Sequence, residues 1–247
     1  MASDFTRIGA NIPAMQSLNS FNSINNRIAT HQLRLATGKR INTAGDDPAG
    51  YQLAKTLDSR ARGLQVAFDN VSNAQNLLNI AEGGYQSIMD LLQTMKEKAT
   101  QAADGLYSGT QRSSLNDQVT ALLAEIDDIV NETTFNGSNL INGSYSTTSF
   151  QTGETAADTL AVSLQGADSI DLGVSTVSLA SQASASAAMA TISSAITTLS
   201  QRIQDVGEYK ARLTSKEGTL AVAVTNTEAV RSTIEDADFA REQMPGF

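Results

Sequence analysis

The sequence contains no cysteine, no tryptophan, a single histidine and only three prolines. Without cysteine, the chain cannot form a disulfide framework, a thiol nucleophile or a cysteine-ligated metal site. With one histidine, most acid–base and nucleophilic catalytic constellations cannot be assembled, so we expect neither enzyme activity nor a cofactor. Few prolines permit long uninterrupted helices, and few aromatic residues suit a thin helical bundle better than a thick globular core.

Basic residues are absent from the middle of the sequence. No Lys or Arg lies between Arg112 and Arg202, whereas this window holds nine acids and the rest of the chain is balanced. A nucleic-acid-binding protein needs a basic face that displaces counterions from phosphates, and this charge distribution excludes that class. An acidic middle between two balanced ends instead favours many closely packed copies with one exposed, acidic segment.

Long apolar runs are absent as well. No stretch approaches the roughly eighteen apolar residues of a membrane-spanning helix, so we expect no membrane span. Residues 1–20 also lack an apolar core of signal-peptide length. If the protein leaves the cell, we expect export without a cleaved signal peptide.

The apolar residues that are present recur every three or four positions. This periodicity predicts helices over residues 14–36, 48–104 and 184–236, and a further helix after a polar break at 104–111. The connecting segments are short except in the middle of the chain. We therefore predict a mainly α fold, a long antiparallel coiled-coil or helical-bundle rod with a small β-hairpin region in the middle of the sequence.

The strongest periodicity runs from Val71 to Ala102, where the steps alternate between three and four residues, as in coiled coils. The same spacing extends the stripe upstream through Leu53, Leu57, Leu64 and Phe68. A similar stripe occupies the last long helix. We assign a self-assembly seam to large residues of these stripes: Leu78, Tyr85, Ile88, Leu92, Met95, Ile192, Ile196, Leu199 and Ile203.

The stretch TGKRINTAGDDPAG (37–50) separates two helical segments. Gly38 can adopt the positive φ that ends a helix, with Lys39 and Arg40 beside the negative end of its dipole. The two adjacent aspartates before Pro48 can both cap the following helix, whose first position suits proline. A phosphate-binding or calcium-binding loop fails on spacing, because the required earlier glycine is missing and the acids do not alternate. The stretch therefore predicts a hinge that stops one helix and starts the next.

Residues 133–183 are rich in Gly, Ser, Thr and Asn and contain short alternating runs. This composition predicts one or two exposed β-hairpins. Asn136 and Asn142 each precede Gly-Ser and match the N-glycosylation pattern, but an Asn-Gly turn explains both more simply. Other polar residues are interpreted as solvated surface without chemistry: His31, Asp127–Asp128 and Glu235–Asp236.

Four fragments resemble the bacterial flagellins and follow the order of that family. They are RLATGKRINTAGDDPAG (34–50), NAQNLLNIAEGGYQSIMDLLQTMKEKATQAADG (73–105), EIDDIVNETTFNGSNLING (125–143) and TNTEAVRSTIEDADFA (225–240). The resemblance implies a structural subunit of the flagellar filament, which serves motility and self-assembles with identical subunits through its helical rod and terminal coiled coil. It also implies an extracellular location and export by the flagellar type III apparatus.

The resemblance further implies a division of the chain. Residues 1–36 are expected to form an inner coiled-coil helix, 37–47 a linker, 133–183 an outward segment, and 48–132 with 184–236 the helical rod. The inner coiled coil is expected to use Met15, Phe21, Ile24 and Ile28. Flagellins usually continue with another helix after the DADFA signature, so residues 237–247 are interpreted as a truncated C-terminal tail.

Two alternatives remain open at this point. The linker DDP also occurs in the related hook–filament junction proteins. Some flagellins are also bound by an innate immune receptor through the surface around LLQTMKEKATQ, which suggests a host-receptor-binding variant. The positions of the family's key arginine and leucine there hold Thr94 and Lys98, whereas Gln101 and Glu125 match the family.

Overall fold

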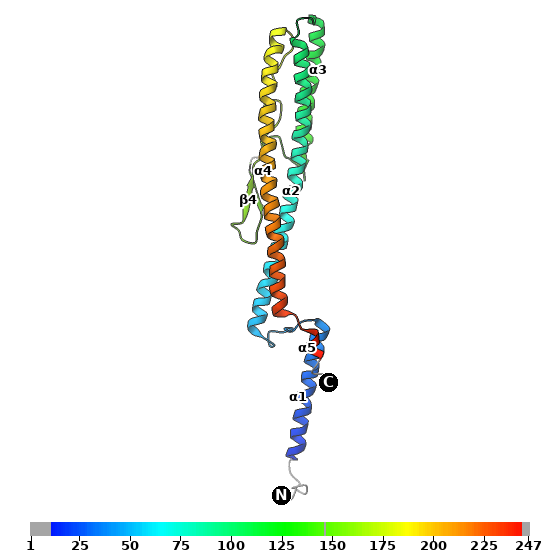
Figure 1. Cartoon of the computed structure of the whole chain (residues 1–247), viewed down its shortest axis with the longest axis vertical. Coiled ribbons are helices and arrows are strands. Elements are labelled where there is room, and N and C mark those ends of the chain that lie inside the picture. Colours follow the sequence, from blue (N-terminus) through cyan, green and yellow to red (C-terminus); the bar gives the residue numbers. More distant parts are fainter. Residues whose placement is uncertain (1–10, 146, 244–247) are drawn as a thin grey trace. The chain divides into compact units, whose positions relative to one another are not determined.

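The computed structural model describes residues 11–145 and 147–243. Most of these residues are helical (Figure 1). The helices are α1 (Ile12–Thr37), α2 (Pro48–Ala103), α3 (Gly109–Glu132), α4 (Gln182–Glu235) and the short α5 (Phe239–Gln243). Two antiparallel hairpins pair β1 (Thr134–Phe135) with β2 (Ser138–Asn139), and β3 (Thr148–Gln151) with β4 (Thr159–Val162). The predicted mainly α fold with a small β-hairpin region is confirmed.

The chain divides into two compact units, residues 63–222 and residues 1–62 with 223–247. In the first unit, α3 and α4 both run antiparallel to α2. Lys210 of α4 pairs with Glu82 of α2, and Gln75 Nε2 donates to Glu217 Oε2 at 3.0 Å, so earlier residues of α2 meet later residues of α4. The end of α3 lies close to the middle of α2: a Cβ atom placed on Gly84 of α2 would be only 2.7 Å from the hydroxyl of Thr133, the residue that follows α3.

A heptad seam forms the core of this unit. In α2, every residue of the predicted stripe from Val71 to Ala102 is buried. In α4, buried residues recur seven apart, which keeps them on one side of a slightly supercoiled helix. These α4 residues are Ala185, Ile192, Leu199, Val206, Leu213 and Leu220.

The predicted stripe is wrong at several positions, and at some of them a neighbouring alanine is buried in place of the larger apolar residue. Leu53 is exposed and Ala54 is buried in its place, while Leu57 and Phe68 are only half-buried. In α4, Ala188 and Ala195 are buried, whereas Ile196 and Ile203 are half-buried. The distance between packed helices depends on the side chains at their contact, and alanine permits a close approach that periodicity alone does not reveal.

The middle segment is not the exposed excursion that its composition predicts. Between α3 and α4 the chain returns to the bundle and buries apolar side chains along its length. Its loops are also tied to the bundle by polar groups: Leu179 N donates to Asn116 Oδ1 at 2.8 Å. The buried residues are Leu140, Ile141, Leu160, Val162, Leu164, Leu172, Val174 and Leu179.

Within that segment, the Asn-Gly turn is observed as predicted. Asn136 and Gly137 have φ values of +49° and +78° and join the paired residues Phe135 and Ser138. Two positive φ values in a two-residue loop define the type I′ turn, whose twist matches that of the flanking strands. This geometry accounts for the Asn-Gly sequence without invoking a modification.

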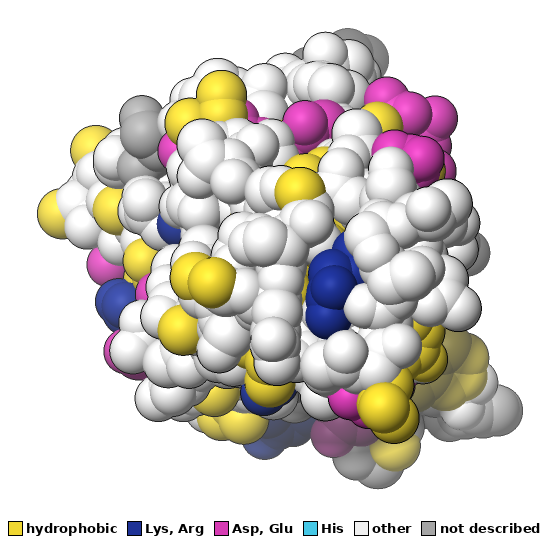
Figure 2. All heavy atoms as spheres, turned by 90° about the horizontal axis from the view of Figure 1, so that it is seen from above, with side chains coloured by type: hydrophobic (Ala, Val, Ile, Leu, Met, Phe, Trp, Pro, Cys, Tyr) yellow, Lys and Arg dark blue, Asp and Glu magenta, His cyan; other side chains and the backbone are white. Residues whose placement is uncertain are grey.

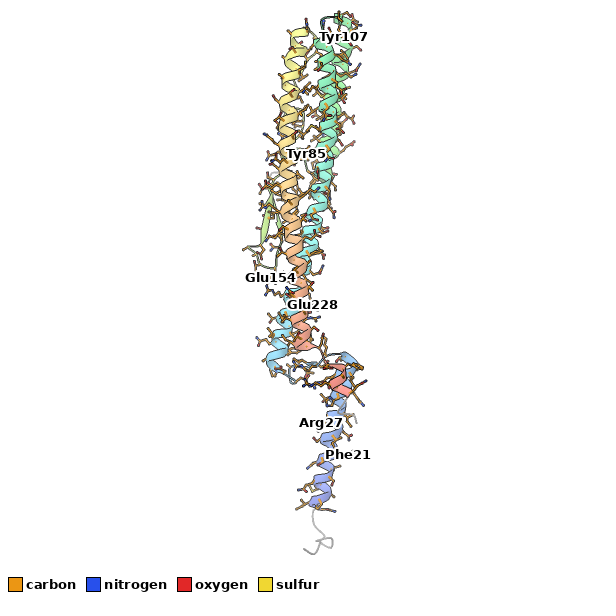
Figure 3. All side chains as sticks on the ribbon, in the orientation of Figure 1. Phe21, Arg27, Tyr85, Tyr107, Glu154 and Glu228 are labelled. Carbon is orange, nitrogen blue, oxygen red and sulfur yellow. The ribbon has the colours of Figure 1, made fainter. Side chains whose placement is uncertain are left out.

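Tyr85 joins the middle segment to α2 (Figure 3). Its side chain is buried, and its hydroxyl donates to the Gln165 carbonyl at 2.6 Å. Burial raises the pKa of Tyr85 to about 12, because the phenolate cannot be solvated there. The neutral tyrosine is therefore required by the folded state.

The raised pKa of Tyr85 predicts a loss of stability in alkali. The contribution is complete below the ordinary tyrosine pKa of 10.0 and is lost as the pH rises towards about 12. A shift of this size corresponds to roughly 2–3 kcal/mol. Urea denaturation from pH 9 to 12 should show this additional loss in the native chain, and Tyr85→Phe should remove it. The variant should also cost about 1–2 kcal/mol at neutral pH, since the Gln165 carbonyl loses its donor. Parallel curves for both proteins above pH 10 would contradict the assignment.

Candidate assembly surfaces

The linker after α1 is held against the end of α4. Gly38 ends α1 with φ +70°, as predicted. The next residues pair with the α4 terminus through backbone hydrogen bonds: Arg40 N donates to Glu235 O at 2.7 Å, and Ala237 N donates to Gly38 O at 2.9 Å. Ile41 is only 2% exposed. The linker is therefore an ordered part of its unit.

Side chains strengthen this attachment. Glu235 is 6% exposed and accepts from Lys39 Nζ at 2.7 Å, while Arg231 Nη1 lies 3.5 Å from its other oxygen. Arg40 Nη2 donates to the Ile234 carbonyl at 2.6 Å. The hydrogen bond that Arg231 Nε donates to the Glu228 carboxylate raises the pKa of Arg231 further above its ordinary value. We call the set Lys39, Arg40, Arg231 and Glu235 the linker clamp.

The linker clamp corrects two expectations. Lys39 and Arg40 were expected beside the C-terminal end of α1, but their side chains bind the C-terminal end of α4, where the helix dipole is equally negative. Glu235 was expected on a solvated face, but it is buried because two cations from different parts of the chain neutralise it.

The two aspartates before Pro48 have different roles. Asp47 Oδ1 accepts from Gly50 N at 3.0 Å, so Asp47 caps α2 as expected. Asp46 does not cap the helix. Its Oδ2 accepts from Thr43 N at 2.8 Å and from Asn42 N at 3.0 Å, which closes the preceding loop. These hydrogen bonds hold the pKa of Asp46 below its usual value.

The apolar face of α1 carries most of the exposed large hydrophobic side chains described in its unit. Met15, Phe21, Ile24 and Ile28 are between 44% and 61% exposed, and Leu18 lies among them. The helix also carries an exposed charged residue: Figure 3 labels the apolar Phe21 and the charged Arg27, which both lie on α1. The short helix α5 contacts α1 near its C-terminal end, at His31 and Arg34. Most of the face therefore lies open for a partner.

Unlike the exposed face of α1, most of the predicted self-assembly seam is buried inside the chain. Leu78, Tyr85, Ile88, Leu92, Met95, Ile192 and Leu199 are buried within a single chain, with Ile196 and Ile203 half-buried. The fully buried side chains of this set cannot touch another subunit, so they hold the bundle together. A direct role of Ile196 and Ile203 in assembly stays a prediction.

The four residues of the suggested receptor surface lie on two helices. Thr94 and Lys98 are half-buried on α2, Gln101 is exposed near the end of α2, and Glu125 is exposed on α3. The Thr94 hydroxyl donates to the Asp90 carbonyl of its own helix at 3.0 Å. The recognition role of this set stays a prediction.

The end of the bundle at which α2 turns into α3 is mostly uncharged (Figure 2). Hydrophobic side chains are scattered over it, and charged groups occupy a small part. Leu106, in the turn, is 90% exposed. Arg112 is used internally, since its guanidinium donates to the carbonyls of Ala102 at 2.8 Å and Asp104 at 2.7 Å. A contact at this end would rest on close packing rather than on charge.

Asp127 was expected on a solvated face, and the structure corrects this as well. Its carboxylate accepts from Ser169 N at 2.8 Å and from Ser169 Oγ at 3.0 Å, which ties the middle segment to α3. A shallow cleft beside this contact is lined by Asn131, Asn142 and Asp168. In the part of the chain that the structure describes, no three acidic or histidine side chains gather closely enough to hold a metal ion. No helix there combines the length and apolarity needed to cross a membrane.

Comparison with protein families decides what kind of helical bundle this is. The model of the bacterial flagellin N-terminal helical region matches residues 8–146, more than half of the chain. The model of the bacterial flagellin C-terminal helical region matches residues 189–245. The chain belongs to the bacterial flagellin family.

Individual flagellins agree with this assignment. The B-type flagellin of Pseudomonas aeruginosa is 38% identical over 166 residues, which cover 67% of this chain and 34% of that protein. Flagellin FlaB1 of Treponema pallidum is 30% identical over an alignment of 253 positions, which covers 96% of this chain and 88% of that protein. The crystal structure of a Bacillus cereus flagellin has a TM-score of 0.50 and 26% identity, covering 64% of this chain and 88% of that chain. This flagellin-family chain thus spans about a third of the Pseudomonas relative and most of the Treponema relative.

Proposed function

We propose that this flagellin-family chain is a structural subunit of an extracellular bacterial flagellar filament, with identical subunits as its partners and no catalytic role. Family membership supports the general function, since the curated relatives are flagellins. The observation that carries the assembly mechanism is the open apolar face of α1. Most of the stability of a helix in a protein comes from packing its apolar face on a neighbour, and the apolar stripe of α1 gains this stability only when a partner covers it.

In this proposal each segment of the chain has its own place in the filament. The segment 1–36, of which residues 1–10 lie outside the described residues, supplies the inner helix that packs against neighbouring chain segments, and 37–47 link it to the bundle. Residues 48–132 with 184–236 form the rod that packs subunit against subunit, and 133–183 lie on its outer side. The tail from residue 237 begins with α5; residues 244–247 of the tail lie outside the described residues. Export through the flagellar type III apparatus, without cleavage of a signal peptide, belongs to the same proposal.

Charge on the α1 face tests the proposal. A tagged chain produced in a flagellated bacterium should appear in filaments sheared from the cells. The double variant Phe21→Asp, Ile24→Asp should reduce its share of the filament fraction by about tenfold or more, because two unpaired carboxylates on a face that becomes buried cost several kcal/mol. Immunoblotting of sheared filaments and of the cell-free medium separates assembly from export.

The matched control carries the same charge on the opposite side of α1. Ser23→Asp, Asn26→Asp should enter filaments like the unmodified chain, since these polar residues lie away from the apolar stripe. The proposal fails if the unmodified chain never enters filaments. It also fails in its mechanism if both double variants are secreted and incorporated equally.

A further inference from the structure

The single histidine of the chain lies where α5 meets α1. His31 Nδ1 of α1 is within hydrogen-bonding distance of Glu242 Oε2 of α5, and Arg34 Nη1 lies 3.4 Å from the other oxygen of the same carboxylate. The Glu242 side chain is only 11% exposed, and those of His31 and Arg34 are 25% exposed. This three-residue contact, which we call the α5 latch, is the main polar attachment of α5 to α1 among the described residues.

Other charged residues lie near the α5 latch, but His31 is its only histidine. Arg27 lies one turn before His31 on α1, and Arg241 precedes Glu242 on α5. From the linker, Asp46 lies close enough to Arg34 for the arginine to contribute to the lowered pKa of its carboxyl group, after the larger effect of the Thr43 backbone hydrogen bond. The guanidinium of Arg34 is thus shared between two carboxylates and stays charged at every physiological pH.

We propose that the α5 latch is pH-sensitive and that protonation of His31 tightens the docking of α5 on α1. Histidine is the side chain that ordinarily changes charge between about pH 5 and 8. A protonated imidazole makes a charge-assisted hydrogen bond to a carboxylate, and such bonds are roughly twice as strong as neutral ones. In this proposal, the extra stability of the docked α5 is present at the acidic side of this window and is lost as the pH rises.

The latch is modulated rather than opened completely, because Arg34 holds Glu242 at any pH in the window. Exchanging a charge-assisted bond for a neutral one should change the ratio of docked to undocked α5 by about threefold to tenfold. The consequence for the filament rests on the proposed function: docked α5 covers the end of α1 beside its open apolar face. The latch itself is a contact inside one chain.

Nuclear magnetic resonance of the soluble chain tests the latch directly, because one histidine gives one imidazole signal. Between pH 5 and 8.5, the backbone amide signals of Ala240 to Gln243 should shift together with the imidazole signal. In His31→Gln these amides should lose that pH response. In Glu242→Gln the imidazole loses its carboxylate partner, and its titration should differ from that in the native chain.

The control Glu97→Gln makes the same change of charge at an exposed site on α2, and it should leave the imidazole titration unchanged. The proposal is overturned if the α5 amides do not follow the imidazole, or if Glu242→Gln and Glu97→Gln give the same titration. The measurement needs no filament, so a failure of the assembly experiment leaves this result standing, and the reverse also holds.

Discussion

Leu92→Asp should unfold the bundle already at room temperature, so that heating produces no cooperative transition. Leu92 is fully buried in the middle of the α2 seam. Removing a buried leucine side chain costs about 2–5 kcal/mol, and burying an unpaired carboxylate adds several kcal/mol more. The total rivals the roughly 5–15 kcal/mol that hold a typical domain together. Circular dichroism during heating measures the loss.

The neighbouring substitution Gln93→Asp provides the control. Gln93 is exposed on the same helix, so the variant introduces the same carboxylate with similar helix propensity and no burial. Its stability should stay within about 1 kcal/mol of the unmodified chain. If Leu92→Asp melted like Gln93→Asp, the seam at this position would not be the dry core that the structure describes.

Val162→Asp should destabilise the bundle by about 3–5 kcal/mol, although the residue lies in the segment whose composition predicts exposure. Val162 ends β4 and is fully buried against the bundle. The expected cost is below that of Leu92→Asp, because valine is smaller and a hairpin can shift to let water reach the carboxylate. Urea denaturation gives the free energy, and amide exchange over residues 140–179 reports whether the segment detaches.

Ala161→Asp is the matched variant on the same strand. Ala161 is exposed, and successive strand residues point to opposite faces. This change should cost no more than about 1 kcal/mol, the span of strand propensities. Equal losses for the two variants would mean that the alternation of β4 carries no packing, and the middle segment would then be the exposed excursion that its composition suggests.

Features that depend on neighbouring residues were determined by the sequence alone. The stripe from Val71 to Ala102 identified the buried side of α2 because helical geometry brings every third or fourth residue to one side. Gly38 and the Asn136–Gly137 turn were predictable for a similar reason, since the positive φ each adopts is a property of a few residues. The family could also be recognised from ordered local fragments.

The tertiary structure decided which distant groups meet. The sequence predicts that Lys39 and Arg40 interact with the C-terminal end of the helix before them, but in the folded chain their side chains bind the C-terminal end of α4. The contact of His31 with Glu242 and the attachment of Tyr85 to Gln165 likewise join residues far apart in sequence. Hydrophobic periodicity ranks residues by their own polarity, so it predicted that Leu53 rather than Ala54 would be buried. Burial instead follows how closely two surfaces approach, and that distance is a property of both surfaces together.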